Sequence, residues 1–257
     1  SVIVAMHHEQ DMRKMGGLWK YMPITYVVTI IGNLALAGVP PFAGFFSKDM
    51  ILEAASNAHE HGLFGRSFVV FCAYSAVIVT ACYSFRQLFM TFHGKERFRE
   101  VHSDHHDAHA DDHAHHVVEP KESPWVITLP LILLAIPSVI IGWLAFDKFV
   151  PGEFFHDAIF NASFFANKLA EDPITPIHMM LASLHELPVY LALSGILLAF
   201  IAHKSPRFVV IVKSIFKPVI YVMERKYFMD DLFINVFAPL ARGIGKVLWK
   251  VGDIFLI

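Results

Sequence analysis

The chain has 257 residues, of which 55% are hydrophobic and 17% charged, and its mean hydropathy is +0.50. Soluble domains usually contain about a quarter charged residues, so this composition argues against one. The net charge of −2 and the lack of a basic stripe with interleaved aromatic residues argue against nucleic acid as a partner. Charged residues are missing from four stretches and concentrated between them, which is typical of an integral membrane protein.

Both ends of the chain carry apolar patterns that stop abruptly. Ser1–Met6 resembles the end of an apolar helix, and residues 251–257 end within a hydrophobic pattern. We therefore expect the chain to be a fragment of a longer protein, lacking both ends.

The segment Pro23–Phe46 is long enough to cross a membrane but contains Pro40 and Pro41 between Gly38 and Gly44. This run cannot continue a regular helix, because backbone donors are lost and the proline rings clash with the preceding turn. At membrane depth a break persists only where it is buried in protein or faces water. The sequence therefore predicts a discontinuous transmembrane helix.

Ser47, Lys48 and Asp49 follow this break directly. A charged lysine at membrane depth costs on the order of 3 kcal/mol or more, so Lys48 should face the bundle interior and a partner, for which Asp49 is the candidate. A lysine in such surroundings can exchange protons near neutral pH, as a proton relay requires. The competing interpretation is that Lys48 extends to the membrane interface while Asp49 caps a helix over Met50–Ala58.

Thr25, Thr29 and Asn33 recur every four residues on one face of the half-helix that precedes the break. These side chains could line a water path. Polar groups at this spacing more often hold neighbouring helices together. The spacing alone leaves both roles open.

Three further segments have the length and composition of transmembrane helices, namely Phe68–Phe85, Val126–Phe146 and Leu187–His203. The second contains no charged residue and has Trp125 and Trp143 near its ends as interface anchors. The third is short and could be lengthened by Ile177–Leu184, with Pro188 as a kink.

Residues 93–123 connect two of these segments and contain a histidine-rich run. Its histidines are His102, His105, His106, His109, His113, His115 and His116. His105, His109 and His113 are four residues apart and could chelate zinc or nickel on one helical face. No cysteine accompanies them, so we favour a disordered, solvated loop with adventitious metal affinity and assign no metal site.

From Phe228 onward, hydrophobic residues recur at three- and four-residue steps, which predicts an amphipathic helix interrupted near Pro239. Such a helix should lie along a surface against other helices or lipid. Residues 1–203 would then form the transmembrane helices, and residues 204–257 a connector and the start of this lateral helix. The predicted fold is all-α integral membrane: a transmembrane helix bundle with a discontinuous helix and a C-terminal amphipathic lateral helix.

Lysine and arginine residues in the connecting regions predict the orientation. Residues 1–20, 93–123 and 204–226 contain thirteen of them, and four crossings place these three regions on one side of the membrane. The opposite side has only Arg66, Lys148 and Lys168. Positive residues favour the cytoplasmic side, so the three regions and the lateral helix should face the cytoplasm.

Four groups of residues carry a family resemblance. They are His8–Leu18, Ala43–Asp49, Tyr83–Arg86 with Phe92–Glu96, and Tyr227–Leu232 continuing to Lys250. In this order, over nearly the whole chain, they resemble the antiporter-like subunit L (chain 5) family of respiratory complex I, NADH–quinone oxidoreductase. The first two groups are specific, whereas the histidine-rich run is not part of the family's pattern.

The resemblance implies the C-terminal part of a proton-channel subunit in the membrane arm of complex I, in a bacterial inner membrane. Lys48 matches the family's lysine in the discontinuous helix, with Asp49 beside it in the proton relay, and Asp230 matches an acidic position on the lateral helix. The implied partners are other membrane-arm subunits, particularly the neighbouring antiporter-like subunits, and the lipid bilayer. No cofactor is expected in this chain, and FMN, iron–sulfur clusters and quinone are expected in other subunits, since no dinucleotide, cysteine-cluster or haem motif occurs here.

Other functions compete with this one. The large subunit of a multisubunit sodium/proton antiporter resembles the same core, but the Glu9–Met15 segment and the start of the lateral helix favour complex I. The chain could also be a structural membrane-arm subunit, in which case removing the charge of Lys48 would leave pumping intact. A metal transporter would depend on the histidine-rich run alone.

Overall fold

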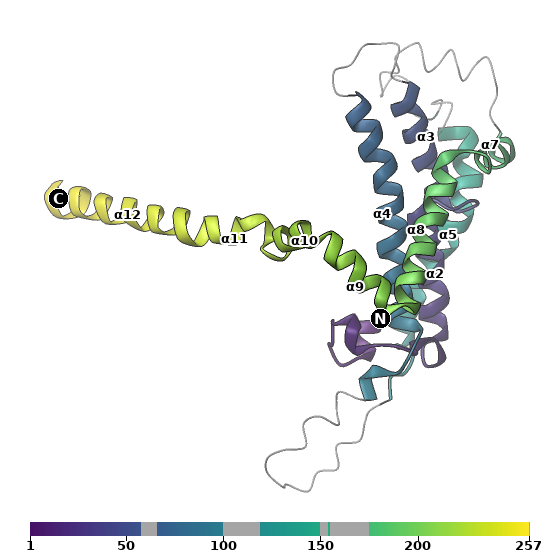
Figure 1. Ribbon diagram of the computed structural model, residues 1–257, viewed down its shortest axis with the longest axis horizontal. Helices are drawn as coiled ribbons and strands as arrows, with labels where there is room; N and C mark the ends of the chain where they lie inside the picture. Colours follow the sequence, from purple (N-terminus) through teal and green to yellow (C-terminus); the bar gives the residue numbers. More distant parts are fainter. Residues whose placement is uncertain (58–65, 100–118, 150–153, 155–174, 257) are drawn as a thin grey trace, which may run out of the picture. The chain divides into compact units, whose positions relative to one another are not determined.

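The computed structural model describes residues 1–57, 66–99, 119–149, 154 and 175–256 (Figure 1). Within these ranges the regular elements are helices, and no strand occurs. The chain divides into two compact units, residues 1–204 and residues 205–257, each described by itself.

The first unit holds the long apolar helices. Its elements are α1 (Val2–Ala5), η1 (Met12–Lys14), η2 (Leu18–Lys20), α2 (Pro23–Ala37), α3 (Ala43–Asn57), α4 (Arg66–Phe92), η4 (Arg97–Arg99), α5 (Trp125–Phe149), α7 (Pro176–Ser183) and α8 (Leu187–Lys204). By length and composition α4, α5 and α8 can each cross a membrane, and α2 is a shorter apolar helix. The predicted all-α membrane fold is confirmed.

Two of these helices differ from their predicted extents. Helix α4 continues beyond Phe85 to Phe92 and includes an exposed Arg86, because apolar residues that pack inward continue past this arginine. Helix α7 is separate from α8 and does not lengthen it. Pro188 lies in the first turn of α8, where its missing N–H costs no intrahelical hydrogen bond, so it accompanies a new helix start instead of a kink.

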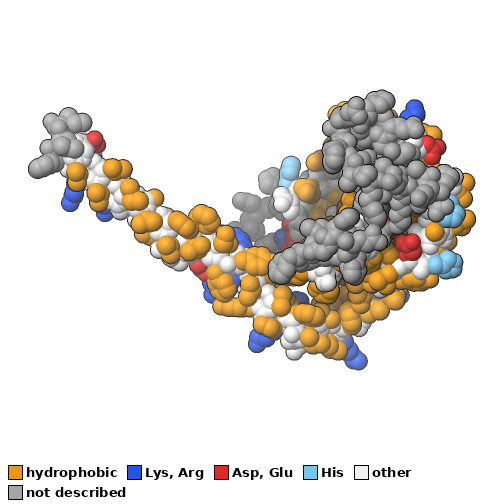
Figure 2. All heavy atoms as spheres, turned by 90° about the horizontal axis from the view of Figure 1, so that it is seen from above, with side chains coloured by type: hydrophobic (Ala, Val, Ile, Leu, Met, Phe, Trp, Pro, Cys, Tyr) orange, Lys and Arg blue, Asp and Glu red, His pale blue; other side chains and the backbone are white. Residues whose placement is uncertain are grey.

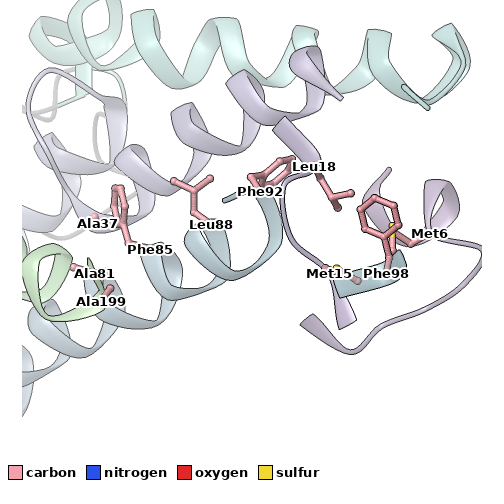
Figure 3. Close-up of a cluster of buried hydrophobic side chains, with 10 residues drawn as sticks. All are labelled: Met6, Met15, Leu18, Ala37, Ala81, Phe85, Leu88, Phe92, Phe98 and Ala199. Atoms are coloured by element: carbon pink, nitrogen blue, oxygen red, sulfur yellow. The ribbon is translucent and has the colours of Figure 1, made fainter. Parts of the chain in front are cut away.

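The largest buried cluster centres on α4, whose Phe85, Leu88 and Phe92 line up along the helix (Figure 3). Small residues allow α8 to approach α4 closely. Ala81 and Ala199 are fully buried, and a Cβ added at Gly195 would lie 2.5 Å from the carbonyl oxygen of Ile78. Close backbone approach through alanine and glycine is a common way for membrane helices to pack.

One end of the first unit gathers three connecting segments, residues 1–22, 93–99 and 119–124, which we call the loop end. The backbone N–H of Gly17 donates to the carbonyl of His93 at 3.3 Å, and Nε of Arg97 donates to the carbonyl of Arg13 at 2.7 Å. The first two positively charged regions of the sequence therefore share one end, as the orientation prediction requires. The side of the membrane that this end faces stays a prediction.

The second unit is a series of helical segments. They are α9 (Pro206–Ile215), α10 (Lys217–Glu224), η6 (Lys226–Phe228), α11 (Met229–Leu232), η7 (Phe233–Phe237), α12 (Ala238–Leu248) and η8 (Trp249–Leu256), of which η7 and η8 are π-helical. The predicted interruption near Pro239 is present as a local widening, because η7 leads directly into the first turn of α12, where this proline lies.

Hydrophobic side chains cover much of the visible face of the second unit (Figure 2). By length and composition the run Lys226–Ile254 could also cross a membrane. The amphipathic pattern favours a surface position, and the lateral placement of this helix stays a prediction.

Candidate functional site

The predicted break separates α2 from α3. Helix α2 ends at Gly38, whose backbone φ of 76° is left-handed, and the N–H of Gly38 returns to the carbonyl of Ala35 at 3.2 Å. The N–H of Val39 donates to the carbonyl of Leu34 at 3.1 Å. Glycine adopts this conformation without the steric cost of a Cβ, so Gly38 ends α2 sharply and α3 starts anew at Ala43.

The beginning of α3 lies directly against the last turn of α2. A Cβ added at Gly44 would lie 1.9 Å from the carbonyl oxygen of Ala35, so no larger residue fits here without a backbone shift. From α5, the indole Nε1–H of Trp143 donates to the carbonyl of Pro41 at 3.1 Å and so satisfies a backbone acceptor within the break.

Lys48 lies on α3, and its side chain turns back to the end of α2. Its Nζ donates to the carbonyl oxygen of Ala37 at 3.2 Å, and its methylene chain lies beside Gly38. The last carbonyls of a helix lack intrahelical partners and carry a partial negative charge, so a lysine ammonium is favourable there. Lys48 therefore caps the broken helix from inside the unit, which differs from the competing picture of a lysine directed at the membrane interface.

Asp49 is 7% exposed and lies within α3. It cannot cap a helix over Met50–Ala58, because α3 already begins at Ala43. Among the ion pairs of the described residues none joins Asp49 to Lys48, but both side chains line the same small cavity beside Gly38. The two residues are therefore neighbours around one cavity while the lysine is held by a backbone carbonyl.

Asp49 also lines a second pocket of about 270 Å³, whose lining does not include Lys48. Two further carboxylates, Glu53 and Glu186, line this pocket together with Tyr74. It lies at the end of the unit opposite to the loop end, near the beginning of α8 (Figure 1). Sequence reasoning did not identify Glu53 or Glu186, because only tertiary packing brings α3 and the residue preceding α8 together.

A second carboxylate, Glu122, binds the other end of α2. Met22, which precedes α2, provides no side-chain cap. Instead Oε2 of Glu122 accepts hydrogen bonds from the backbone N–H groups of Ile24 at 2.9 Å and Thr25 at 3.3 Å, and Oε1 accepts one from the hydroxyl of Thr25 at 2.5 Å. Sequence reasoning missed Glu122, because an N-cap is normally sought next to the helix and this one comes from the segment before α5.

The polar residues predicted on one face of α2 are largely buried. Thr29 donates its hydroxyl to the carbonyl of Thr25 at 2.6 Å, and Nδ2 of Asn33 donates to the carbonyl of Ser84 on α4 at 3.1 Å. Asn33 thus joins two helices, in line with the helix-holding role. The hydroxyl oxygen of Ser84 is buried and has no hydrogen-bond partner among the described residues.

The remaining predicted residues lie elsewhere. Asp230 is exposed in the second unit, where its carboxylate accepts a hydrogen bond from Lys226 at 2.5 Å, one helical turn away. The histidines of residues 102–116 lie outside the described residues, so their metal affinity stays a hypothesis. Elsewhere in the described ranges no three histidine, cysteine, aspartate or glutamate side chains are grouped to hold a metal ion.

At the loop end, His93 follows the last residue of α4. Its Nε2 and the hydroxyl of Tyr26 are hydrogen-bonded at 3.0 Å, and its ring lies against Phe89. Burial lowers the pKa of His93, because partial removal from water disfavours the charged imidazolium. His93 therefore favours its neutral form in the folded protein.

Comparisons with known proteins cover the candidate site. The family described as NADH:quinone oxidoreductase/Mrp antiporter, TM, matches residues 1–87, which include the break, Lys48 and Asp49. NADH-quinone oxidoreductase subunit L of Neisseria meningitidis serogroup A is 45% identical over 264 aligned residues, covering 100% of this chain and 39% of the relative.

More distant relatives carry corresponding names. NAD(P)H-quinone oxidoreductase chain 5 of a Picosynechococcus species is 36% identical, covering 95% of this chain and 36% of that protein. NADH-ubiquinone oxidoreductase chain 5 of Dictyostelium citrinum is 34% identical, covering 97% of this chain and 36% of that protein. The chain thus spans about two fifths of the length of these curated relatives. On its sequence, its broken helix and these matches, the chain belongs to the family of antiporter-like membrane subunits L (chain 5) of NADH–quinone oxidoreductase.

Proposed function

We propose that the chain takes part in proton translocation across the membrane as a subunit of NADH–quinone oxidoreductase, with Lys48 as a proton relay. The observation that carries this proposal is the placement of Lys48, an ionisable amine inside a membrane-type unit, on the carbonyl of Ala37 at the end of a broken helix. Ionisable groups at membrane depth are costly, and they commonly mark ion or proton pathways.

The surroundings of Lys48 give a proton two neighbouring positions. The protonated amine donates to the carbonyl of Ala37, and Asp49 lines the same cavity and can accept a proton from it. Asp49 also lines the pocket that contains Glu53 and Glu186, so a proton on Asp49 has further acceptors towards the end opposite the loop end. We assign proton release to that end.

The whole-protein context belongs to the same proposal. The names of the relatives favour other complex I subunits as partners, particularly the neighbouring antiporter-like ones, with FMN, iron–sulfur clusters and quinone held outside this chain. We place the protein in a bacterial inner membrane, with the loop end and the lateral helix on the cytoplasmic side, because positive residues concentrate there. Asp230 is proposed as an acidic residue of the lateral helix that contributes to coupling.

The test is NADH-driven proton pumping in membrane vesicles that carry Lys48→Ala in the full-length subunit, with NADH oxidation measured in parallel. A matched control is Lys148→Ala, which removes an exposed lysine near the end of α5. We expect Lys48→Ala, but not the control, to lower the number of protons moved per NADH while the complex remains assembled. Unchanged pumping and turnover in Lys48→Ala would mean that the lysine has only a structural role.

The family description also includes sodium/proton antiporters, and this alternative has its own test. An antiporter of that kind would exchange protons for sodium in vesicles in the absence of NADH, and the exchange would depend on Lys48. Pumping that requires NADH and does not respond to sodium supports the complex I assignment.

A further inference from the structure

A row of polar side chains runs along α2 between the two charged residues that bind its ends. Thr25, Thr29 and Asn33 succeed one another at one-turn intervals, and Ser84 of α4 lies beside Asn33. The exposed fractions are 3% for Thr25, 8% for Asn33 and 1% for Ser84. We call these four residues the inner polar row.

The inner polar row connects at both ends to groups that can hold a charge. At the loop end the hydroxyl of Thr25 donates to the carboxylate of Glu122 at 2.5 Å. At the other end Asn33 lies one turn, about 6 Å, before Ala37, whose carbonyl oxygen accepts from Lys48. The row therefore spans the helix from Glu122 to Lys48.

Packing alone does not require these polar groups. Alanine occupies the next inward position on each helix, at Ala37 one turn after Asn33 and at Ala81 one turn before Ser84, and both alanines are fully buried. A buried hydroxyl without a partner costs about 1–3 kcal/mol, so an alanine at position 84 would pack at lower cost than Ser84 does. A buried polar group of this kind is a site where water can bind.

We infer that the inner polar row carries protons from Glu122 at the loop end to Lys48, with water bound at the hydroxyl of Ser84. This inference rests on the proposed relay function of Lys48. A hydroxyl or a water accepts a proton on one lone pair as it releases another to the next acceptor, so each proton entering at Glu122 is matched by one arriving at the neutral amine of Lys48. The ammonium so formed returns to the amine by losing a proton towards Asp49.

Within the row the residues have different tasks. The hydroxyls of Thr25, Thr29 and Ser84 can both donate and accept, so they can pass protons on. The amide of Asn33 does not exchange protons in this way; it is a positioning residue that fixes Ser84 and its water through the hydrogen bond to the Ser84 carbonyl.

The decisive variant is Ser84→Ala in the full-length subunit within the assembled complex. The Ser84 hydroxyl has no protein partner among the described residues, so a purely structural role predicts that its removal is neutral or slightly stabilising. The inference predicts the opposite for function: at least a threefold fall in protons moved per NADH, with unchanged assembly. Asn33→Leu should show the same fall, because it removes the group that positions Ser84.

Thr128→Val is the matched control, since Thr128 is 2% exposed on α5 and lies outside the row. It should leave the proton-to-NADH ratio unchanged. If Lys48→Ala stops pumping while Ser84→Ala and Asn33→Leu keep the parental ratio, the row is structural and the inference fails, although the proposed function stands. If Lys48→Ala keeps the parental ratio, the proposed function fails and the inference fails with it.

Discussion

Glu122 and Lys48 bind opposite ends of one helix. The carboxylate of Glu122 accepts the N–H of Ile24 at 2.9 Å at the start of α2, and the ammonium of Lys48 donates to the carbonyl of Ala37 at 3.2 Å at its end. A negative charge at the N-terminus and a positive charge at the C-terminus both complement the helix dipole, each by about 0.3–1 kcal/mol and up to about 2 kcal/mol where partly buried. Helix α2 is therefore held at each end by a charged side chain from another segment.

The Glu122 cap predicts a graded loss of stability. Glu122→Ala should destabilise the subunit by about 1 kcal/mol, as expected for the loss of an N-cap acceptor. Glu122→Gln should cost less, because its amide oxygen can still accept from the backbone of α2. Thermal unfolding of the detergent-solubilised full-length subunit measures both variants, and equal melting temperatures for the alanine variant and the parent would contradict the capping role.

Gly44 and Gly32 predict opposite responses to the same substitution. Gly44→Ala places a Cβ 1.9 Å from the carbonyl oxygen of Ala35, so α3 must shift away from α2, at a cost of about 1–3 kcal/mol. Because α3 carries Lys48, pumping should fall along with stability. Gly32→Ala is the control within α2: nothing lies within 4 Å of the added Cβ, and helix propensity should stabilise it by about 0.5–1 kcal/mol. A Gly44→Ala variant as stable and active as Gly32→Ala would show that the break tolerates a wider spacing.

His93 predicts a pH dependence at the loop end. Burial lowers its pKa in the folded protein below the ordinary value of 6.5, so the unfolded chain binds a proton more readily than the folded one as pH falls through 6.5. Stability should therefore be fully present above pH 6.5 and decrease as the pH falls through the folded pKa. His93→Phe keeps a ring of similar size and removes the titration. The difference in melting temperature between parent and variant, measured from pH 7.5 to pH 5, should change below pH 6.5, and a constant difference would show that His93 does not contribute.

Local residue chemistry was enough to predict the main elements. Hydrophobic runs of sufficient length predicted the helices α4, α5 and α8, because a membrane-spanning helix has few other compositions available. Gly38 and Pro40–Pro41 predicted the break between α2 and α3, because a left-handed glycine and missing backbone donors cannot be placed within a regular helix. Lys48 was selected for the same reason, since a charge next to such a break needs a partner.

The partner itself was decided by tertiary structure. The sequence suggested Asp49 because it is adjacent, but neighbouring residues on a helix project in different directions, and Lys48 instead donates to the carbonyl of Ala37. In the same way Glu122, Glu186 and Ser84 carry no motif, and they join the site because distant segments pack against α2 and α3. Composition and periodicity act locally and so determined which segments form helices and where one of them breaks. The contacts of a charged or polar side chain depend on which helices meet, and only the folded arrangement decided that.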